Sequence, residues 1–154
     1  MLTRRKLLTC GSQIALSAFA GWSPLLAAES KRGMPVMLYK TPGCECCSGY
    51  ADYLRSHGFT VTVMETEKLA AISGNAGIPP ELQGCHTSFL GGYVVDGHVP
   101  IEAVQKLLAE RPAIKGLALA GMPTGSPGMP GPKQEPFIIH AIDKEGKSSL
   151  YMKV

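Results

Sequence analysis

Short blocks of apolar residues alternate with polar segments along the chain and predict strands and helices in turn. The run 36–40 predicts a buried strand, and 59–65 predicts a second strand because its valines fall on one face. Between them, residues 47–57 predict a helix whose apolar face contains Tyr50, Ala51, Tyr53 and Leu54. Gly58 follows in the position where glycine ends helices. The first part of the chain is therefore expected to form a strand–helix–strand unit.

The same alternation continues after residue 65. A short helix is expected over 66–72, capped by its first residue and stopped by the polar residues 73–75. Residues 88–95 predict another strand, and Asp96-Gly97 is typical of a hairpin turn after it.

The last third of the sequence predicts a helix, a long loop and a hairpin. Pro100 suits the first turn of a helix that ends at Glu110, with an apolar face formed by Ile101, Val104, Leu107 and Leu108. Residues 116–132 contain five glycines and four prolines and are expected to be a loop. Residues 137–141 and 149–152 are expected to pair as a terminal hairpin.

This order of elements predicts an α/β protein. A strand, a Cys-x-Cys-Cys motif, a helix and a second strand, followed by further helices and strands, resemble a thioredoxin-like domain. The expected fold is a thioredoxin-like sandwich with a mixed sheet, in which the Cys-x-Cys-Cys motif lies at the N-terminus of the first helix.

The N-terminal segment is expected to be an export signal, cleaved near residue 28. Basic residues at 4–6 precede an uncharged, largely apolar stretch over 7–20, and small residues at 25–28 offer a cleavage site. The paired arginines also resemble a twin-arginine signal. An uncleaved anchor is the alternative, but glycine, proline and polar residues interrupt the stretch, so no stable membrane span is expected in the mature protein. We therefore divide the chain into a signal, 1–28, and a single thioredoxin-like metal-binding domain, 29–154.

Composition becomes informative once this signal is set aside. The 154 residues include 15 basic and 12 acidic side chains, and the formal net charge of +3 is too small to indicate a nucleic-acid-binding protein. The excess positive charge lies in the signal, so the mature chain is expected to be neutral and to keep four of the five cysteines. The predicted location is the bacterial periplasm, where thiols oxidise unless a metal or a reductant protects them.

Three of the remaining cysteines lie within four residues. Cys44 and Cys47 form a Cys-x-x-Cys pair at the start of the predicted helix, where the helix dipole favours the thiolate form. These two cysteines are the candidates for redox chemistry. Cys46 adds a third sulfur, which exceeds what a dithiol switch needs and indicates thiolates that bridge soft metal ions.

The fourth cysteine, Cys85, lies just before the expected third strand. In thioredoxin-like folds this segment packs against the helix that carries the Cys-x-x-Cys motif, and it usually contains a cis-proline that helps to bind peptides. This chain has Cys85-His86-Thr87 there instead, which argues against a plain thioredoxin. We expect all four cysteines to share one site. The alternative is two ordinary disulfides, although the adjacent Cys46 and Cys47 are poorly placed to pair with each other.

The donor atoms limit the choice of metal. Four thiolates suit zinc, an iron–sulfur cluster or Cu(I), and the three-plus-one spacing differs from the two separated pairs of a typical zinc site. The Gly/Pro-rich loop adds Met122 and Met129, and thioether ligands select Cu(I). We therefore favour copper, as Cu(I) and as more than one ion. The two methionines are candidate copper contacts or a lid, unless they only pin the loop to the core.

Histidines and acidic residues near these motifs are further candidates. His86 neighbours Cys85 and is a candidate copper ligand or thiolate partner, with a structural turn as the alternative. His98 is expected to orient a loop, with metal ligation as the alternative, and Glu45 is expected to be solvated, with compensation of the copper charge as the alternative. The remaining three are His57 at a helix C-terminus, Asp96 in a turn, and His140 without an assignment.

Together these motifs resemble the CopG-type family of periplasmic metal-binding proteins of copper resistance, a former domain of unknown function. The resemblance covers roughly residues 34–153 and rests on Cys44-x-Cys46-Cys47, Cys85-His86-Thr87, Asp96-Gly97-His98-Val99-Pro100, Glu110-Arg111-Pro112 and the segment 121–129. It implies a thioredoxin-like fold, copper at the cysteines, and a role in handling or redox-converting periplasmic copper. Where an acidic residue is expected after Met129, this chain has Pro130-Gly131-Pro132.

Several functions stay open at this point. The favoured one is a periplasmic copper-binding protein that sequesters Cu(I) or passes it to efflux or oxidase components. A second is a copper or thiol oxidoreductase that uses the copper–thiolate centre or a Cys44–Cys47 disulfide. A third is a metal-free thiol–disulfide exchanger in which Cys44 attacks and both Cys46 and Cys85 are dispensable. An iron–sulfur electron carrier is a further alternative.

Overall fold

The structure is a computed structural model that describes residues 33–154. The expected export signal, 1–28, lies outside the described residues. In chain order, the elements are β1 (Pro35–Lys40), α1 (Glu45–Ser56), β2 (Thr60–Glu65), α2 (Leu69–Asn75), the 3-10 turn η1 (Pro80–Leu82), β3 (His86–Leu90), β4 (Tyr93–Asp96), α3 (Ile101–Glu110), β5 (Gly116–Ala118), β6 (Ile138–Ile142) and β7 (Ser148–Lys153).

These strands form one seven-stranded mixed sheet in the order β2-β1-β3-β4-β5-β6-β7. β1 pairs with β2 in parallel, whereas β3 is antiparallel to both of its neighbours, β1 and β4. β5 is parallel to β4, and β6 and β7 extend the sheet as the terminal hairpin that the sequence predicts. The arrangement confirms the expected thioredoxin-like α/β fold, with the Cys-x-Cys-Cys motif at the start of the first helix.

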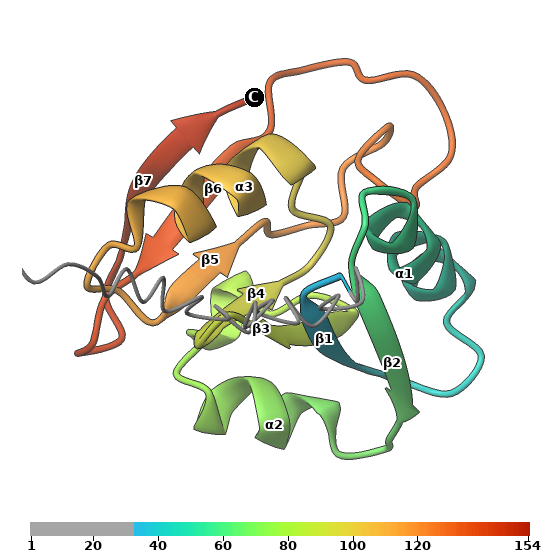
Figure 1. Ribbon diagram of the computed structural model, residues 1–154, viewed down its shortest axis with the longest axis horizontal. Coiled ribbons are helices and arrows are strands. Elements are labelled where there is room, and N and C mark those ends of the chain that lie inside the picture. Colours follow the sequence, from blue (N-terminus) through green and yellow to red (C-terminus); the bar gives the residue numbers. More distant parts are fainter. Residues whose placement is uncertain (1–32) are drawn as a thin grey trace, which may run out of the picture.

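Helices cover both faces of the sheet (Figure 1). α1 and α3 lie on one face, and α2 lies on the other. The larger core cluster joins α1 and α3 to the sheet through residues such as Leu38, Leu54 and Leu107. A smaller cluster around Ile78 and Leu82 fills the opposite face. Among residues 33–154, no helix is long and apolar enough to cross a membrane.

The β3–β4 hairpin occurs where the sequence predicts a single strand over 88–95. Gly91 and Gly92 have φ angles of 57° and 89°, and a two-residue loop with positive φ at both positions is the favoured turn for a hairpin. The expected hairpin at Asp96-Gly97 is also wrong, because β4 ends at Asp96 and the chain then continues into α3.

Helix boundaries differ from the expected ones as well. α1 begins at Glu45 rather than at residue 47, so Cys44 is its N-cap. α2 begins at Leu69 because the Thr66 hydroxyl accepts a hydrogen bond from the amide of Lys68, in a turn before the helix. The helix also includes Ser73, whose hydroxyl donates to the Leu69 carbonyl within the helix. Finally, the segment expected to be only a loop begins with β5, which is fully buried.

The loop that follows β5 returns to α1 and packs on it through glycine. A Cβ at Gly128 would lie 2.6 Å from the carbonyl oxygen of Cys46 and 2.6 Å from the amide nitrogen of Tyr50. On the helix, a Cβ at Gly49 would lie 3.2 Å from the Gly128 Cα. The absence of both side chains therefore lets the loop backbone lie directly against the first turns of α1, beside Cys46.

Gly128→Ala is expected to lower the free energy of unfolding by about 1–3 kcal/mol more than Gly121→Ala, because the added methyl group overlaps the backbone of α1. The two glycines have φ angles of 84° and 79°, so the backbone strain of each substitution is similar. A Cβ at Gly121 would meet nothing within 4 Å. Urea denaturation of both variants measures the difference, and equal losses of stability would contradict the docking of this loop.

Candidate metal centre

Strand pairing brings two distant segments of the chain together. Lys40, at the end of β1, pairs with His86 at the start of β3. The chain leaving β1 carries the Cys-x-Cys-Cys motif into α1, and the residue immediately before β3 is Cys85. The four cysteines expected to share a site therefore meet at the same end of the sheet.

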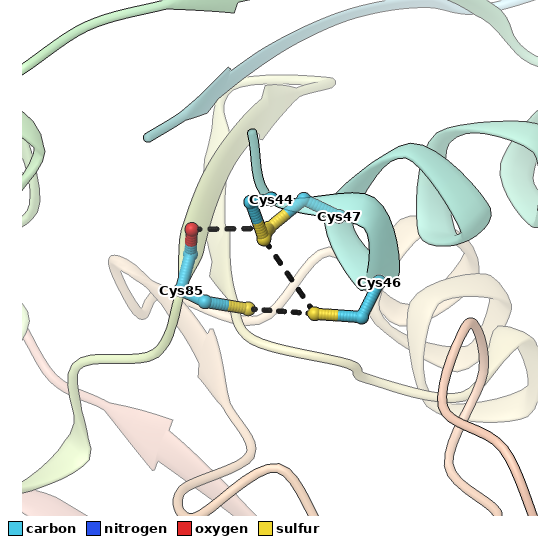
Figure 2. Close-up of side chains that lie close together, drawn as sticks. All are labelled: Cys44, Cys46, Cys47 and Cys85. Carbon is cyan, nitrogen blue, oxygen red and sulfur yellow. Dashed lines mark hydrogen bonds between the residues drawn. A yellow bond between two sulfur atoms is a disulfide. The ribbon is translucent and has the colours of Figure 1, made fainter. Parts of the chain in front are cut away.

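Figure 2 shows the four sulfur atoms grouped between α1 and the segment before β3. Cys44 and Cys47 are joined in a disulfide, and Cys46 and Cys85 are free. The Cys46 Sγ atom lies 3.5 Å from Cys44 Sγ and 3.7 Å from Cys85 Sγ. All four sulfur atoms lie within 4.8 Å of one another, so the structure brings together the whole predicted set.

The local environment differs between these sulfurs. Cys44 is the N-cap of α1, and the other two cysteines of the motif lie in its first turn. Cys47 is fully buried, whereas Cys44 and Cys46 are half-buried. Burial first, and the neighbouring Cys46 second, raise the pKa of Cys85. Cys85 is consequently a neutral thiol at pH 7, and a metal ion must displace its proton.

His86 lies beside this group, as its position in the sequence suggests. Its side chain is fully buried, and Nδ1 lies 3.5 Å from Cys85 Sγ. The ring packs against Tyr50, with ring centroids 4.5 Å apart. Burial, followed by the nearby His98, lowers the pKa of His86 to about 3, so the ring is neutral at pH 7 and able to act as a ligand.

His98 has two contacts, one for each of the roles that the sequence left open. As expected it orients a loop, because Nδ1 lies 2.6 Å from the carbonyl oxygen of Pro127. Its Nε2 atom, however, lies 3.2 Å from Cys85 Sγ. Burial lowers the pKa of His98 and favours the neutral ring. His98 therefore connects the loop that carries Met122 and Met129 to the four cysteines.

The sequence feature that could have revealed the contact between His98 and Cys85 is Gly91-Gly92, the turn of the β3–β4 hairpin. In the β3–β4 ladder, Thr87 pairs with Asp96, and the amide of Gly97 donates to the carbonyl of His86. In this register Gly97 lies opposite His86, and the next position places His98 opposite Cys85. Reading Gly91-Gly92 as the turn would have predicted this pairing, whereas a turn at residues 96–97 removes it.

Asp96 also has a role other than the expected turn. Its buried carboxylate accepts hydrogen bonds from the amide of Gly84 and from the hydroxyl of Thr87. The hydroxyl oxygen of Ser73 in α2 lies 2.6 Å from that of Thr87, so α2 packs directly against this group. The carboxylate thus fixes the backbone directly before Cys85.

The other predicted residues lie farther from the chemistry or in the loop. Met122 is 40% exposed, and Met129 is half-buried and follows Gly128, the residue that packs beside the Cys46 carbonyl. His57 is the exposed C-cap of α1, and Glu45 is exposed at its start, both as expected. His140 lies in β6 and lines a separate cavity of about 310 Å³.

Comparisons with known proteins agree with this geometry. Residues 82–129 match a family model described as a protein of unknown function, DUF411. No curated protein matches the chain. Two solved structures, titled copper resistance protein CopG, Form 2 and Form 1, are each 31% identical to it and cover 80% of it. The matches span 99% and 98% of those chains, with TM-scores of 0.74 and 0.73. The chain therefore belongs to the CopG family of copper resistance proteins.

Proposed function

We propose that this chain is a periplasmic copper-binding protein of copper resistance that holds more than one Cu(I) ion on Cys44, Cys46, Cys47 and Cys85. The observation that carries the proposal is the approach of all four sulfur atoms to within 4.8 Å of one another. Thiolates are the ligands that Cu(I) prefers, and the titles of the similar structures name copper resistance. Export to the periplasm is part of the same proposal.

Loading requires the Cys44–Cys47 disulfide to open. A dithiol donor supplies two electrons and two protons, becomes a disulfide itself, and leaves four thiols at the site. Copper then displaces the thiol protons. Sulfur atoms within 4.8 Å of one another are too close for each to bind an ion of its own. We therefore infer that the thiolates bridge neighbouring copper ions.

Three further side chains are proposed to contribute donors. His86 offers a neutral imidazole 3.5 Å from Cys85 Sγ. Met122 and Met129 belong to the loop that packs on α1, and we infer that their thioethers contact copper or close over it. Partners that receive the ion are components of periplasmic copper efflux or oxidation.

A redox function of the same site is the second candidate, and the Cys44–Cys47 disulfide favours it. Two thiolates that close to a disulfide release two electrons, which reduce two Cu(II) ions to Cu(I). A metal-free exchanger would use the same pair of cysteines, with the half-buried Cys44 as the attacking thiolate because Cys47 is fully buried.

Anaerobic titration of reduced residues 29–154 with Cu(I) is expected to saturate above one ion per chain. Cys85→Ser removes the sulfur that lies 3.7 Å from Cys46 Sγ, and it is expected to lower the stoichiometry or weaken binding by about tenfold or more. Ser56→Ala, at the far end of α1, serves as the control and is expected to bind like the wild type. Metal analysis and thiolate-to-copper absorption follow the titration, and saturation below one ion would contradict the proposal.

Copper affinity is expected to fall as the pH is lowered, because protons compete for the thiolates. The raised pKa of Cys85 means that its thiol is protonated over the whole neutral range, and this group contributes to the slope throughout. Cys85→Ser should therefore show a shallower dependence in competition with a chromophoric Cu(I) chelator between pH 6 and pH 8 (roughly the range in which such chelators work). Parallel slopes for the two proteins would contradict this role of Cys85.

Reduction of a protein disulfide such as that of insulin separates the metal-free alternative. A thiol exchanger needs Cys44 and Cys47 only, so its activity would survive Cys46→Ser and Cys85→Ser and disappear in Cys44→Ser. We expect instead that wild-type activity is weak and that Cys85→Ser affects copper binding most. Full insulin reduction by Cys85→Ser, together with unchanged copper binding, would favour the exchanger.

A further inference from the structure

Two of the four sulfur atoms at this end of the sheet are not bonded to another sulfur. Cys44 and Cys47 form a disulfide. Cys46 and Cys85 are free thiols, and both are half-buried. Their Sγ atoms lie 3.7 Å apart and point toward each other between α1 and the segment before β3 (Figure 2). The structure therefore contains one closed pair of cysteines and one open pair.

Cys46 has a single free thiol within its reach. Its other sulfur neighbour, Cys44 Sγ at 3.5 Å, already belongs to the disulfide. Cys47 is the next residue in the chain, and adjacent cysteines are poorly placed to bond to each other. Among residues 33–154, Cys85 is the other free cysteine, so it is the partner available to Cys46.

Contacts on both sides hold the two thiols in place. The first turn of α1 lies against the loop at Gly128, where no side chain separates the loop from the Cys46 carbonyl oxygen. On the other side, the Asp96 carboxylate accepts a hydrogen bond from the Gly84 amide, directly before Cys85. The sulfur atoms of a disulfide lie about 2.05 Å apart, and rotation of the two side chains supplies the remaining approach. Groups held as neighbours in this way react as if at a high effective concentration.

We propose that Cys46 and Cys85 are a second redox pair, which closes to a disulfide after Cys44–Cys47 and removes the last thiolates from the proposed copper site. The release of copper rests on the proposed function, whereas the disulfide itself rests on the geometry. The site accordingly has three states, with four thiols, two thiols or none. The structure has the middle state, in which one pair is closed.

The oxidant is a disulfide, the class of oxidant that an oxidising compartment supplies. One thiol of the pair loses its proton and attacks the oxidant, which breaks the oxidant's sulfur–sulfur bond and forms a mixed disulfide. The second thiol loses its proton and attacks the sulfur of the first, and the Cys46–Cys85 bond forms as the rest of the oxidant is expelled. Two electrons and two protons pass to the oxidant, which leaves as two thiols.

Closure of the second pair changes what the site can hold. With Cys44–Cys47 closed, Cys46 and Cys85 are still available as thiolates, the ligands that Cu(I) prefers. With both pairs closed, none of the four sulfur atoms is a thiolate, and copper is released. Because the coupling is reciprocal, bound Cu(I) opposes closure of the pair. A loaded site therefore resists oxidation, and an empty site closes.

The variant Cys44→Ser/Cys47→Ser of residues 29–154 isolates the second pair. After reduction and treatment with oxidised glutathione, it is expected to lose both thiols and to stay monomeric, and peptide mapping by mass spectrometry is expected to place the link between Cys46 and Cys85. The control carries Cys85→Ser in addition, and its single thiol is expected to end as a mixed disulfide with glutathione. A lasting mixed disulfide or a disulfide-linked dimer in the double variant would overturn the second pair.

The wild type tests the release of copper without any substitution. It is prepared with two free thiols and with none, and the fully oxidised form is expected to bind Cu(I) at least about tenfold more weakly in competition with a chromophoric chelator. Equal affinities would overturn the release. Anaerobic Cu(I) titration of the fully reduced wild type tests the proposed function separately, because that titration can fail while the second disulfide forms, and it can succeed while the pair stays open.

Discussion

The direction of one strand determines where the chemistry of this protein lies. β3 runs antiparallel to both β1 and β4, so its first residue lies beside the last residues of two other strands. The chain leaving β1 carries the Cys-x-Cys-Cys motif, and the chain leaving β4 carries His98. Cys85, just before β3, lies between them. Strand pairing together with the position of α1 therefore brings Cys47 to within 3.2 Å of the carbonyl oxygen of Cys85, 38 positions away in the sequence.

A second constraint comes from the loop after β5. Its backbone lies on α1 at Gly128, and the neighbouring Pro127 carbonyl holds the ring of His98. The position of this loop therefore determines the tautomer of His98 and how closely its ring approaches Cys85. Proline and glycine are suited to this segment because it needs tight turns and close backbone approach more than side-chain packing.

Much of this architecture could be predicted from the sequence. Alternating apolar blocks indicated the α/β class, and the position of Cys85 before a strand placed it near the motif because that relation depends on topology. The hairpin and His98 were less accessible. Gly91-Gly92 and Asp96-Gly97 are both good turn sequences, and only the fold shows that the Asp96 carboxylate is engaged by Gly84 and Thr87. One wrong turn shifts every later cross-strand pair and hides the contact of His98 with Cys85.

The two core clusters carry a consequence for the proposed binding and release of copper. Within residues 33–154, the residues that form these clusters include no cysteine, and packing of the apolar side chains holds the sheet and helices in place. The four sulfur atoms are thus held together by the fold, and the proposed loading needs the disulfide to open but no folding of the chain, unlike a zinc finger, which folds only around its metal. Little ordering entropy has to be lost on binding or regained on release. At the proposed copper site, metal can therefore leave and return without the fold passing through an unfolded state.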